Sequence, residues 1–445
     1  PVIVLGGEMA GNRREIYNHQ AFDHVALMRP VTKYAAELNP QRARQQTARA
    51  VDIAMTHPRG PVFLNCPADS TRGMATESQI FGPAIGTPGV LDAATARSAQ
   101  AVLEGAKRPL ALIGRGALYE GGPVAVKGFI EARQMPFFAT YKAKGVLSEH
   151  HPLCLGAIAL SPVMDDLSLG VIREADALVL IGFDPIELRD AWLDAWPSSL
   201  RVLTLDYAPQ SHRIFPIGQQ LIGDVPAILG QLMPSKSLAS GWSSGKLSAL
   251  RQRVAEIVRP RQPSGRISPA ALFHAVSARV SSDMLMTVDV GAHRILANHV
   301  VACLTPGQLL QSNGLGCMGY AIPAAIGATL ASRKPVVAML GDGCALMSLG
   351  ELAVIAELDL PVVTIVLVDE DLALIDLKQS KMNMTRQAVG FRSPDFAAIA
   401  RGFGMASTEV DDPVGFEAAL VAAMATGKPH LIAAKVDPSE YWDQM

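Results

Sequence analysis

Two aspartates set among glycines form the pattern in this sequence with the most chemical content. Gly341-Asp342-Gly343 directly follows an apolar stretch at 335–340, and Asp369 directly follows the next such stretch, at 361–368. The segment between them has apolar residues at helical spacing, so the whole is predicted to be a βαβ unit with a right-handed crossover. Both carboxylates would then lie at the carboxyl ends of parallel strands, which is where α/β sheets bind ligands.

These residue types suit a divalent cation bound to a phosphate. Neighbouring strands lie about 4.8 Å apart, so Asp342 and Asp369 could share one cation. Mg²⁺ prefers oxygen ligands and often completes its octahedron with phosphate oxygens, and a helix N-terminus favours negative charge. A glycine turn with two solvated acids is the alternative interpretation. The second acid at the next strand end favours the cation site.

With that second acid, Gly341-Asp342-Gly343 resembles the thiamine diphosphate and magnesium motif of thiamine-dependent enzymes. Most members have two asparagines where this chain has Val368-Asp369, but aspartate at the second position also occurs in the catabolic acetolactate synthases. The resemblance implies that Asp342 and Asp369 bind Mg²⁺ through their side chains and Asp371 through its carbonyl. It also places beside the cofactor Gly341, Gly343, Cys344, Leu372, Ala373 and Leu374.

A second resemblance to this family lies at 289–293, Asp-Val-Gly-Ala-His, after a predicted strand at 284–288. It is similar to the family's turn that grips the cofactor diphosphate. The resemblance implies that Gly291 belongs to that turn and that the Ala292 amide and the His293 side chain donate hydrogen bonds. A histidine at the end of a strand, taken alone, is more often structural.

A third segment, at 312–319, resembles the Gly-Leu-Gly-x-Met-Gly motif of the synthases. There Gly316 would accept a hydrogen bond from the cofactor's aminopyrimidine, and Cys317 would lie next to it. Met318 would wedge the cofactor into its bent form and press the 4′-amino group against the thiazolium C2. Core packing is the alternative interpretation of Met318.

The segment 18–33 resembles the pyrimidine-binding domain of acetolactate synthases, beyond the midpoint of that domain. By this resemblance Gln20, Phe22 and Lys33 would face the active site of a partner chain, although Lys33 is also compatible with a solvated lysine. The chain opens on an apolar strand, so we expect that sequence precedes residue 1. The family's activating glutamate matches no residue in this chain.

Short apolar runs alternate with helix-period stretches along the chain, which is typical of an α/β fold with parallel sheets. We predict strands at 1–5, 61–65, 109–113, 177–181, 201–205, 284–288, 335–340, 361–368 and 430–436. Stretches rich in Gly, Pro, Ser and Gln at 69–88 and 234–268 are predicted to be linkers. Three domains result: 1–72, the remainder of a pyrimidine-binding domain; 89–233, a Rossmann-like middle domain; and 266–445, a domain that binds thiamine diphosphate and Mg²⁺.

The composition excludes several classes of protein. Lys plus Arg total 39 and Asp plus Glu total 41, and this balance argues against a nucleic-acid or anionic-membrane partner. No apolar stretch is long enough to span a membrane. The five cysteines are far apart and form no zinc or disulfide pattern, so we expect a cytoplasmic protein. Cys317 and Cys344 are expected to serve as small apolar packing residues.

The middle domain gives no dinucleotide fingerprint, because Gly114-Arg115-Gly116 lacks the GxGxxG spacing. The segment 182–187 resembles the catabolic synthases, which lack FAD, so we expect no FAD here. The resemblance as a whole implies a decarboxylating carboligase that acts on a 2-oxoacid such as pyruvate, in a homodimer or homotetramer with active sites shared between chains. Because the match at 371–379 is looser, a sulfoacetaldehyde or 2-hydroxyacyl-CoA enzyme is one alternative. Because no residue matches the activating glutamate, a non-catalytic cofactor-binding homologue is the other.

Overall fold

The computed structural model describes all residues except 15, 20, 75–88, 194–195, 212–213, 237–238 and 262–264. The chain divides into two compact units, residues 1–90 with 207–209, and residues 91–206 with 210–445. The described strands form three sheets, and every strand pair within them is parallel. The predicted fold class, α/β with three parallel sheets, is therefore confirmed. Most of the first predicted linker, 69–88, lies outside the described residues.

The first unit contains a three-stranded sheet with the order β1-β3-β2. The apolar run of β3 makes it the central strand, and Val62 and Leu64 pack with Ala50 and Ala54 of a helix in a small core. The elements of this unit are β1 (Val2–Glu8), α1 (His24–Met28), β2 (Tyr34–Glu37), α2 (Ala43–Met55) and β3 (Pro61–Pro67).

The second unit begins with a six-stranded sheet of order β6-β5-β4-β7-β8-β9. All five residues of β7 are buried, as expected for an interior parallel strand covered on both faces. The strands are β4 (Pro109–Ile113), β5 (Phe137–Thr140), β6 (Cys154–Ile158), β7 (Ala177–Ile181), β8 (Arg201–Asp206) and β9 (Gln219–Ile222). The helices are α3 (Ala93–Glu104), α4 (Gly122–Arg133), α5 (Pro162–Ile172) and α6 (Val225–Gln231).

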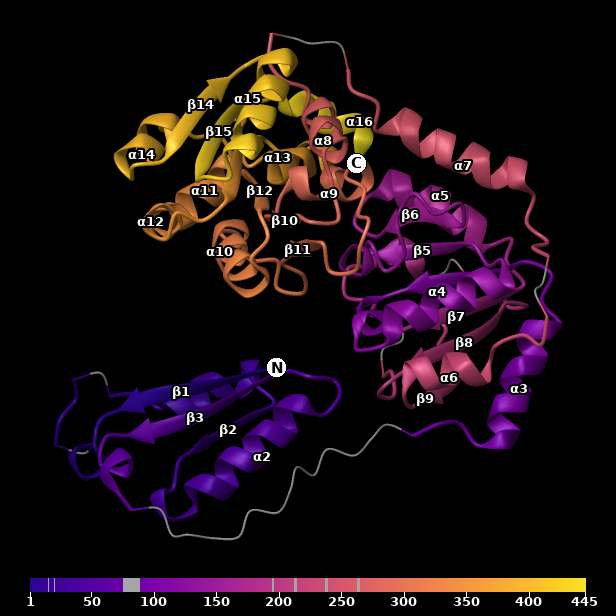
Figure 1. Cartoon of the computed structure of the whole chain (residues 1–445), viewed down its shortest axis with the longest axis horizontal. Coiled ribbons are helices and arrows are strands. Elements are labelled where there is room, and N and C mark those ends of the chain that lie inside the picture. Colours follow the sequence, from indigo (N-terminus) through magenta and orange to yellow (C-terminus); the bar gives the residue numbers. More distant parts are fainter. Residues whose placement is uncertain are drawn as a thin grey trace. The chain divides into compact units, whose positions relative to one another are not determined.

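A second six-stranded sheet follows in the same unit, with the order β11-β10-β12-β13-β15-β14 and helices on both of its faces (Figure 1). Alternate residues of β12 serve opposite cores: Met339 packs with α8, α9 and α15, while Leu340 packs with α10, α12 and α14. The strands are β10 (Leu285–Val288), β11 (Leu309–Gln311), β12 (Val336–Gly341), β13 (Val362–Val368), β14 (Ala406–Val410) and β15 (His430–Lys435). The helices are α8 (Pro269–Ser277), α9 (Ala292–Val300), α10 (Ala321–Ser332), α11 (Asp342–Ser348), α12 (Leu352–Glu357), α13 (Ala373–Lys381), α14 (Phe396–Gly402), α15 (Pro413–Thr426) and α16 (Tyr441–Gln444).

The structure corrects two sequence-based assignments. The helix predicted between Asp342 and Asp369 is interrupted by a 3₁₀ turn and forms two short helices, α11 and α12. The second linker, 234–268, contains the helix α7 (Ser244–Ile257). Its buried Leu247 joins the core of the middle sheet and its Val254 packs on the core of the last sheet, so α7 bridges the two. Among the described residues, no helix is both long and apolar enough to cross a membrane.

Candidate active site

The turn between β10 and α9 presents donors for an anion. Gly291 is the N-cap of α9 and has no side chain to cap it, so the first amides of the helix have no side-chain acceptor. The Nε2 atom of His293 is buried and has no hydrogen-bond partner. Burial lowers the pKa of His293 to about 4, so its ring is neutral near pH 7. The open helix amides can donate hydrogen bonds to a phosphate group, and the negative charge of a bound phosphate would favour the protonated His293 ring, whose Nε2 atom can then donate as well.

The two aspartates of the motif lie at the ends of adjacent strands, because β12 and β13 pair in parallel with Gly341 opposite Leu367. Asp342 Oδ2 accepts hydrogen bonds from the Glu370 amide (2.8 Å) and the Ser393 hydroxyl (2.6 Å). Burial, and then the charge of Asp342, raises the pKa of Asp369 above the usual range of a carboxyl group. A divalent cation between the carboxylates would relieve this repulsion.

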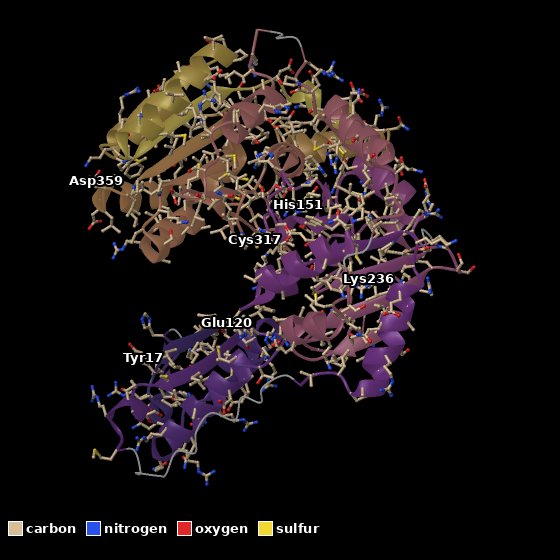
Figure 2. All side chains as sticks on the ribbon, turned by 45° about the vertical axis from the view of Figure 1, so that its right-hand side comes forward. Tyr17, Glu120, His151, Lys236, Cys317 and Asp359 are labelled. Carbon is tan, nitrogen blue, oxygen red and sulfur yellow. The ribbon has the colours of Figure 1, made fainter. Side chains whose placement is uncertain are left out.

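The loop at 312–319 brings Met318 to the same place. A Cβ atom on Gly343 would lie 3.4 Å from Met318 Cε, so the thioether side chain lies directly beside that glycine. Cys317, labelled in Figure 2, is exposed, and its amide donates to Ser312 Oγ (3.2 Å). The expectation that Cys317 packs as a small apolar residue is therefore wrong. Cys344 does pack, since it is buried with its thiol against the Val290 carbonyl.

These segments enclose a cavity of about 120 Å³. Most residues that the sequence placed around the cofactor line it, including Met318 and both metal-site aspartates, whereas Gly316 and Cys317 do not. Sequence reasoning missed Ile375 and Tyr441, and Tyr441 comes from the C-terminal helix α16, where no motif marked it. The lining residues are Val290, Gly291, Ala292, His293, Met318, Gly341, Asp342, Gly343, Cys344, Asp369, Asp371, Leu372, Ala373, Leu374, Ile375 and Tyr441.

The remaining predicted site residues belong to the first unit. Phe22 is 54 % exposed and its ring packs edge-on against His24. Lys33 donates to the carbonyls of Ile53 and Thr56 at the end of α2, so its ammonium group holds a helix terminus and is not simply solvated. Gln20 lies outside the described residues. The partner-facing roles of these three residues stay predictions.

The cavity residues fit a diphosphate with a bound cation. Across the described part of the chain, no cluster of three or more His, Cys, Asp or Glu side chains could hold a metal ion. A cation at Asp342 and Asp369 would therefore have only two side-chain ligands and would take its other oxygens from the backbone and the phosphates. The unpartnered His293 Nε2 and the open amides of α9 supply donors for those phosphates. The donor set is thus incomplete without a phosphate-bearing ligand.

Comparison with known proteins agrees with this geometry. Residues 96–232 match the thiamine pyrophosphate enzyme central domain, and residues 289–434 match the C-terminal TPP binding domain of the same enzymes. The chain is 29 % identical to an acetolactate synthase of Bacillus subtilis strain 168, over 99 % of this chain and 78 % of the relative. It is 28 % identical to a catabolic acetolactate synthase of Raoultella terrigena, over 98 % of this chain and 79 % of the relative.

A third relative, at 28 % identity over 88 % of this chain and 70 % of its own length, is a probable 2-ketoarginine decarboxylase of Pseudomonas aeruginosa. The two domain matches cover the middle sheet and the sheet that carries the cavity, and the relatives extend along nearly the whole chain. The chain belongs to the thiamine pyrophosphate-dependent enzymes of the acetolactate synthase family.

Proposed function

We propose that the protein is a decarboxylating carboligase that converts two pyruvate molecules and one proton into 2-acetolactate and carbon dioxide. The observation that carries the proposal is the cavity, in which His293 Nε2, without a partner, and the paired carboxylates of Asp342 and Asp369 face one space. Two of the relatives described above are named acetolactate synthases. Because these relatives are enzymes, the comparison also favours a catalytic protein over a non-catalytic homologue.

Each segment of the cavity has a separate task in this proposal. Thiamine diphosphate, when bound, supplies the electron sink for the carbanion that forms as carbon dioxide leaves. Asp342 and Asp369 would hold Mg²⁺, with the Asp371 carbonyl as a third ligand. The Ala292 amide and His293 would bind and orient the diphosphate. Met318 would support the bent cofactor, and the resemblance assigns the aminopyrimidine contact to Gly316, which lies in the same loop but does not line the cavity.

One wall of the cavity is relevant to the choice of substrate; it is formed by Leu372, Ala373, Leu374 and Ile375. It is apolar, so it suits the methyl group of pyruvate and excludes water from the reacting atoms. A guanidinium substrate such as 2-ketoarginine would need a free carboxylate on this wall. The charge of Asp371 is already balanced by an ion pair between its Oδ2 atom and Arg386, although its Oδ1 atom has no partner, and the other carboxylates of the cavity are those proposed for the cation. These contacts support pyruvate over 2-ketoarginine as the substrate.

The test is a product assay on the purified protein with thiamine diphosphate, Mg²⁺ and pyruvate, without added flavin. We expect carbon dioxide and acetolactate in equal amounts, little acetaldehyde, and no activity when thiamine diphosphate is omitted. Acetaldehyde as the main product, or turnover of 2-ketoarginine without turnover of pyruvate, would make the protein a decarboxylase. Turnover of sulfoacetaldehyde or a 2-hydroxyacyl-CoA alone would support the other alternative.

Two further features belong to the proposal. The enzyme would work without FAD, because the 182–187 segment resembles the catabolic synthases. It would assemble as a cytoplasmic homodimer or homotetramer, with the first domain of one chain completing the active site of another. Phe22, exposed at 54 %, is the residue of the first unit that we expect to reach the partner's site.

A further inference from the structure

Glu187, in the loop that follows β7, connects the middle domain to both segments that flank the cavity. Its Oε1 atom pairs with Arg294 Nη1 at 3.0 Å, and its Oε2 atom accepts a hydrogen bond from Asn313 Nδ2 at 2.6 Å. The Arg294 Nη1 atom also donates to the Ser312 carbonyl at 2.5 Å. Only 12 % of the Glu187 side chain and 8 % of the Arg294 side chain are exposed. One buried carboxylate thus contacts α9 and the 312–319 loop together.

The partners of Glu187 are next to cofactor-site residues. Arg294 follows His293 in the first turn of α9, and Asn313 begins the loop that carries Met318. Ser312 is fixed from both sides, because its hydroxyl accepts from the Cys317 amide while its carbonyl accepts from Arg294. Glu187 itself does not line the cavity. Its effect on the site must therefore pass through these two segments.

We propose that Glu187 is a positioning residue, by which the middle domain sets the geometry of the cofactor site without contacting the cofactor. The inference rests on the proposed function, since it assumes that thiamine diphosphate binds in the cavity. Arg294 Nε and Asn313 Oδ1 are already buried without partners. Loss of Glu187 would leave a buried guanidinium without its counter-charge and an amide without its acceptor, so both segments would rearrange.

The structure offers a matched control at the same domain boundary. Glu149 is also a buried middle-domain carboxylate, paired with Lys144 at 2.7 Å and accepting from the Cys303 amide at 2.6 Å. Lys144 in turn donates to the Asn298 carbonyl near the end of α9. Glu149→Ala therefore weakens the contact between the two domains as Glu187→Ala does, but it leaves the 312–319 loop untouched.

The experiment measures two quantities in the parent, Glu187→Ala, Glu187→Gln and Glu149→Ala. The first is hydrogen exchange of the 312–319 segment in the cofactor-free protein, which requires no assumption about function. We expect exchange about tenfold faster or more in Glu187→Ala, because a hydrogen-bonded clamp is lost. The second is the affinity for thiamine diphosphate with Mg²⁺, by calorimetry. We expect it to fall about 10- to 100-fold, as for other outer-shell partners of a cofactor site.

Glu187→Gln, which keeps an acceptor for Asn313, should fall between the parent and Glu187→Ala in both measurements. Glu149→Ala should match the parent in both. Unchanged exchange in Glu187→Ala, tighter cofactor binding, or equal effects of Glu187→Ala and Glu149→Ala would overturn the proposal. If Glu187→Ala fails to fold, Asn313→Ala tests the same contact and should speed exchange in the same segment. A parent that binds no thiamine diphosphate refutes the proposed function, while the exchange result still decides whether Glu187 holds the loop.

Discussion

Gly291→Ala is a sharp perturbation of the proposed diphosphate turn. Gly291 has φ +155° and ψ −174°, a region of backbone space that is essentially restricted to glycine. A Cβ atom at this position would lie 2.7 Å from Cε1 and Nδ1 of His293, closer than real Cβ contacts. The substitution therefore strains the turn and also displaces the ring that we expect to bind the diphosphate.

The two effects have separate magnitudes. The backbone conformation alone should cost about 1–3 kcal/mol of folding stability in the alanine variant. The His293 ring must shift by several tenths of an ångström to clear the new methyl group, and a hydrogen bond to a charged phosphate contributes about 1.5–3 kcal/mol. Loss of that bond corresponds to a dissociation constant for thiamine diphosphate raised about 10- to 150-fold.

The assay is calorimetric titration of thiamine diphosphate with Mg²⁺, combined with thermal unfolding of the cofactor-free protein. Gly307→Ala is the matched control, because Gly307 also has a positive φ (+70°) but nothing lies within 4 Å of its added Cβ. It should lose about 1–2 kcal/mol of stability and keep the parent's cofactor affinity. If Gly291→Ala loses stability but binds the cofactor as tightly as the parent, the β10–α9 turn does not hold the diphosphate.

Two further predictions concern carboxylates. Asp342→Ala should abolish the Mg²⁺-dependent part of thiamine diphosphate binding, whereas Asp369→Asn, which keeps an oxygen ligand, should retain most of it. Titrations with Mg²⁺ and with a chelator distinguish the two, and unchanged binding in Asp342→Ala would refute the metal site. Asp165 is buried with both oxygens unpartnered, and burial raises its pKa to about 6. Between the usual value of about 4 and this value, the unfolded state releases a proton that the folded state keeps, so stability falls as pH rises, by about 3 kcal/mol in total. Asp165→Asn should therefore raise the melting temperature strongly at pH 8 and little at pH 4, and an equal gain at both pH values would contradict this origin.

Most interior strands were predictable because each is a continuous run of apolar residues between more polar segments. β7, β12 and β13 are buried on both faces, so their sequences are continuous apolar runs, and their length of five to seven residues distinguishes them from buried helices. The strands that the sequence did not reveal are three to five residues long: β2, β5, β6, β9, β11 and β14. All but β5 are at the edge of a sheet, where one neighbour is lacking and a short polar-containing segment suffices.

The residues of the candidate site also divide into those that the sequence predicted and those that it did not. Motif residues such as Asp342 and His293 were predictable, because the ends of parallel strands meet at one edge of a sheet. Tyr441 and Glu187 were not, because each reaches the site region through tertiary packing that no local spacing encodes. Lys33 shows the reverse case. A lysine is a suitable residue for an active site, but the ammonium group of Lys33 already donates hydrogen bonds to carbonyls at the end of α2.

Helix α9 connects the proposed diphosphate site to the middle domain. In the proposed function its first turn would offer open amides and His293 to the diphosphate, while its last residues contact the middle domain through Asn298, whose carbonyl accepts from Lys144. Arg294, in the same first turn as His293, pairs with Glu187. In the proposed function, the diphosphate and the Glu187 contact both bias the geometry of this turn. Coupling between two contacts is reciprocal, so the Glu187 contact would strengthen cofactor binding by the factor with which the cofactor strengthens that contact, whereas the Lys144 contact at the other end of the helix would not.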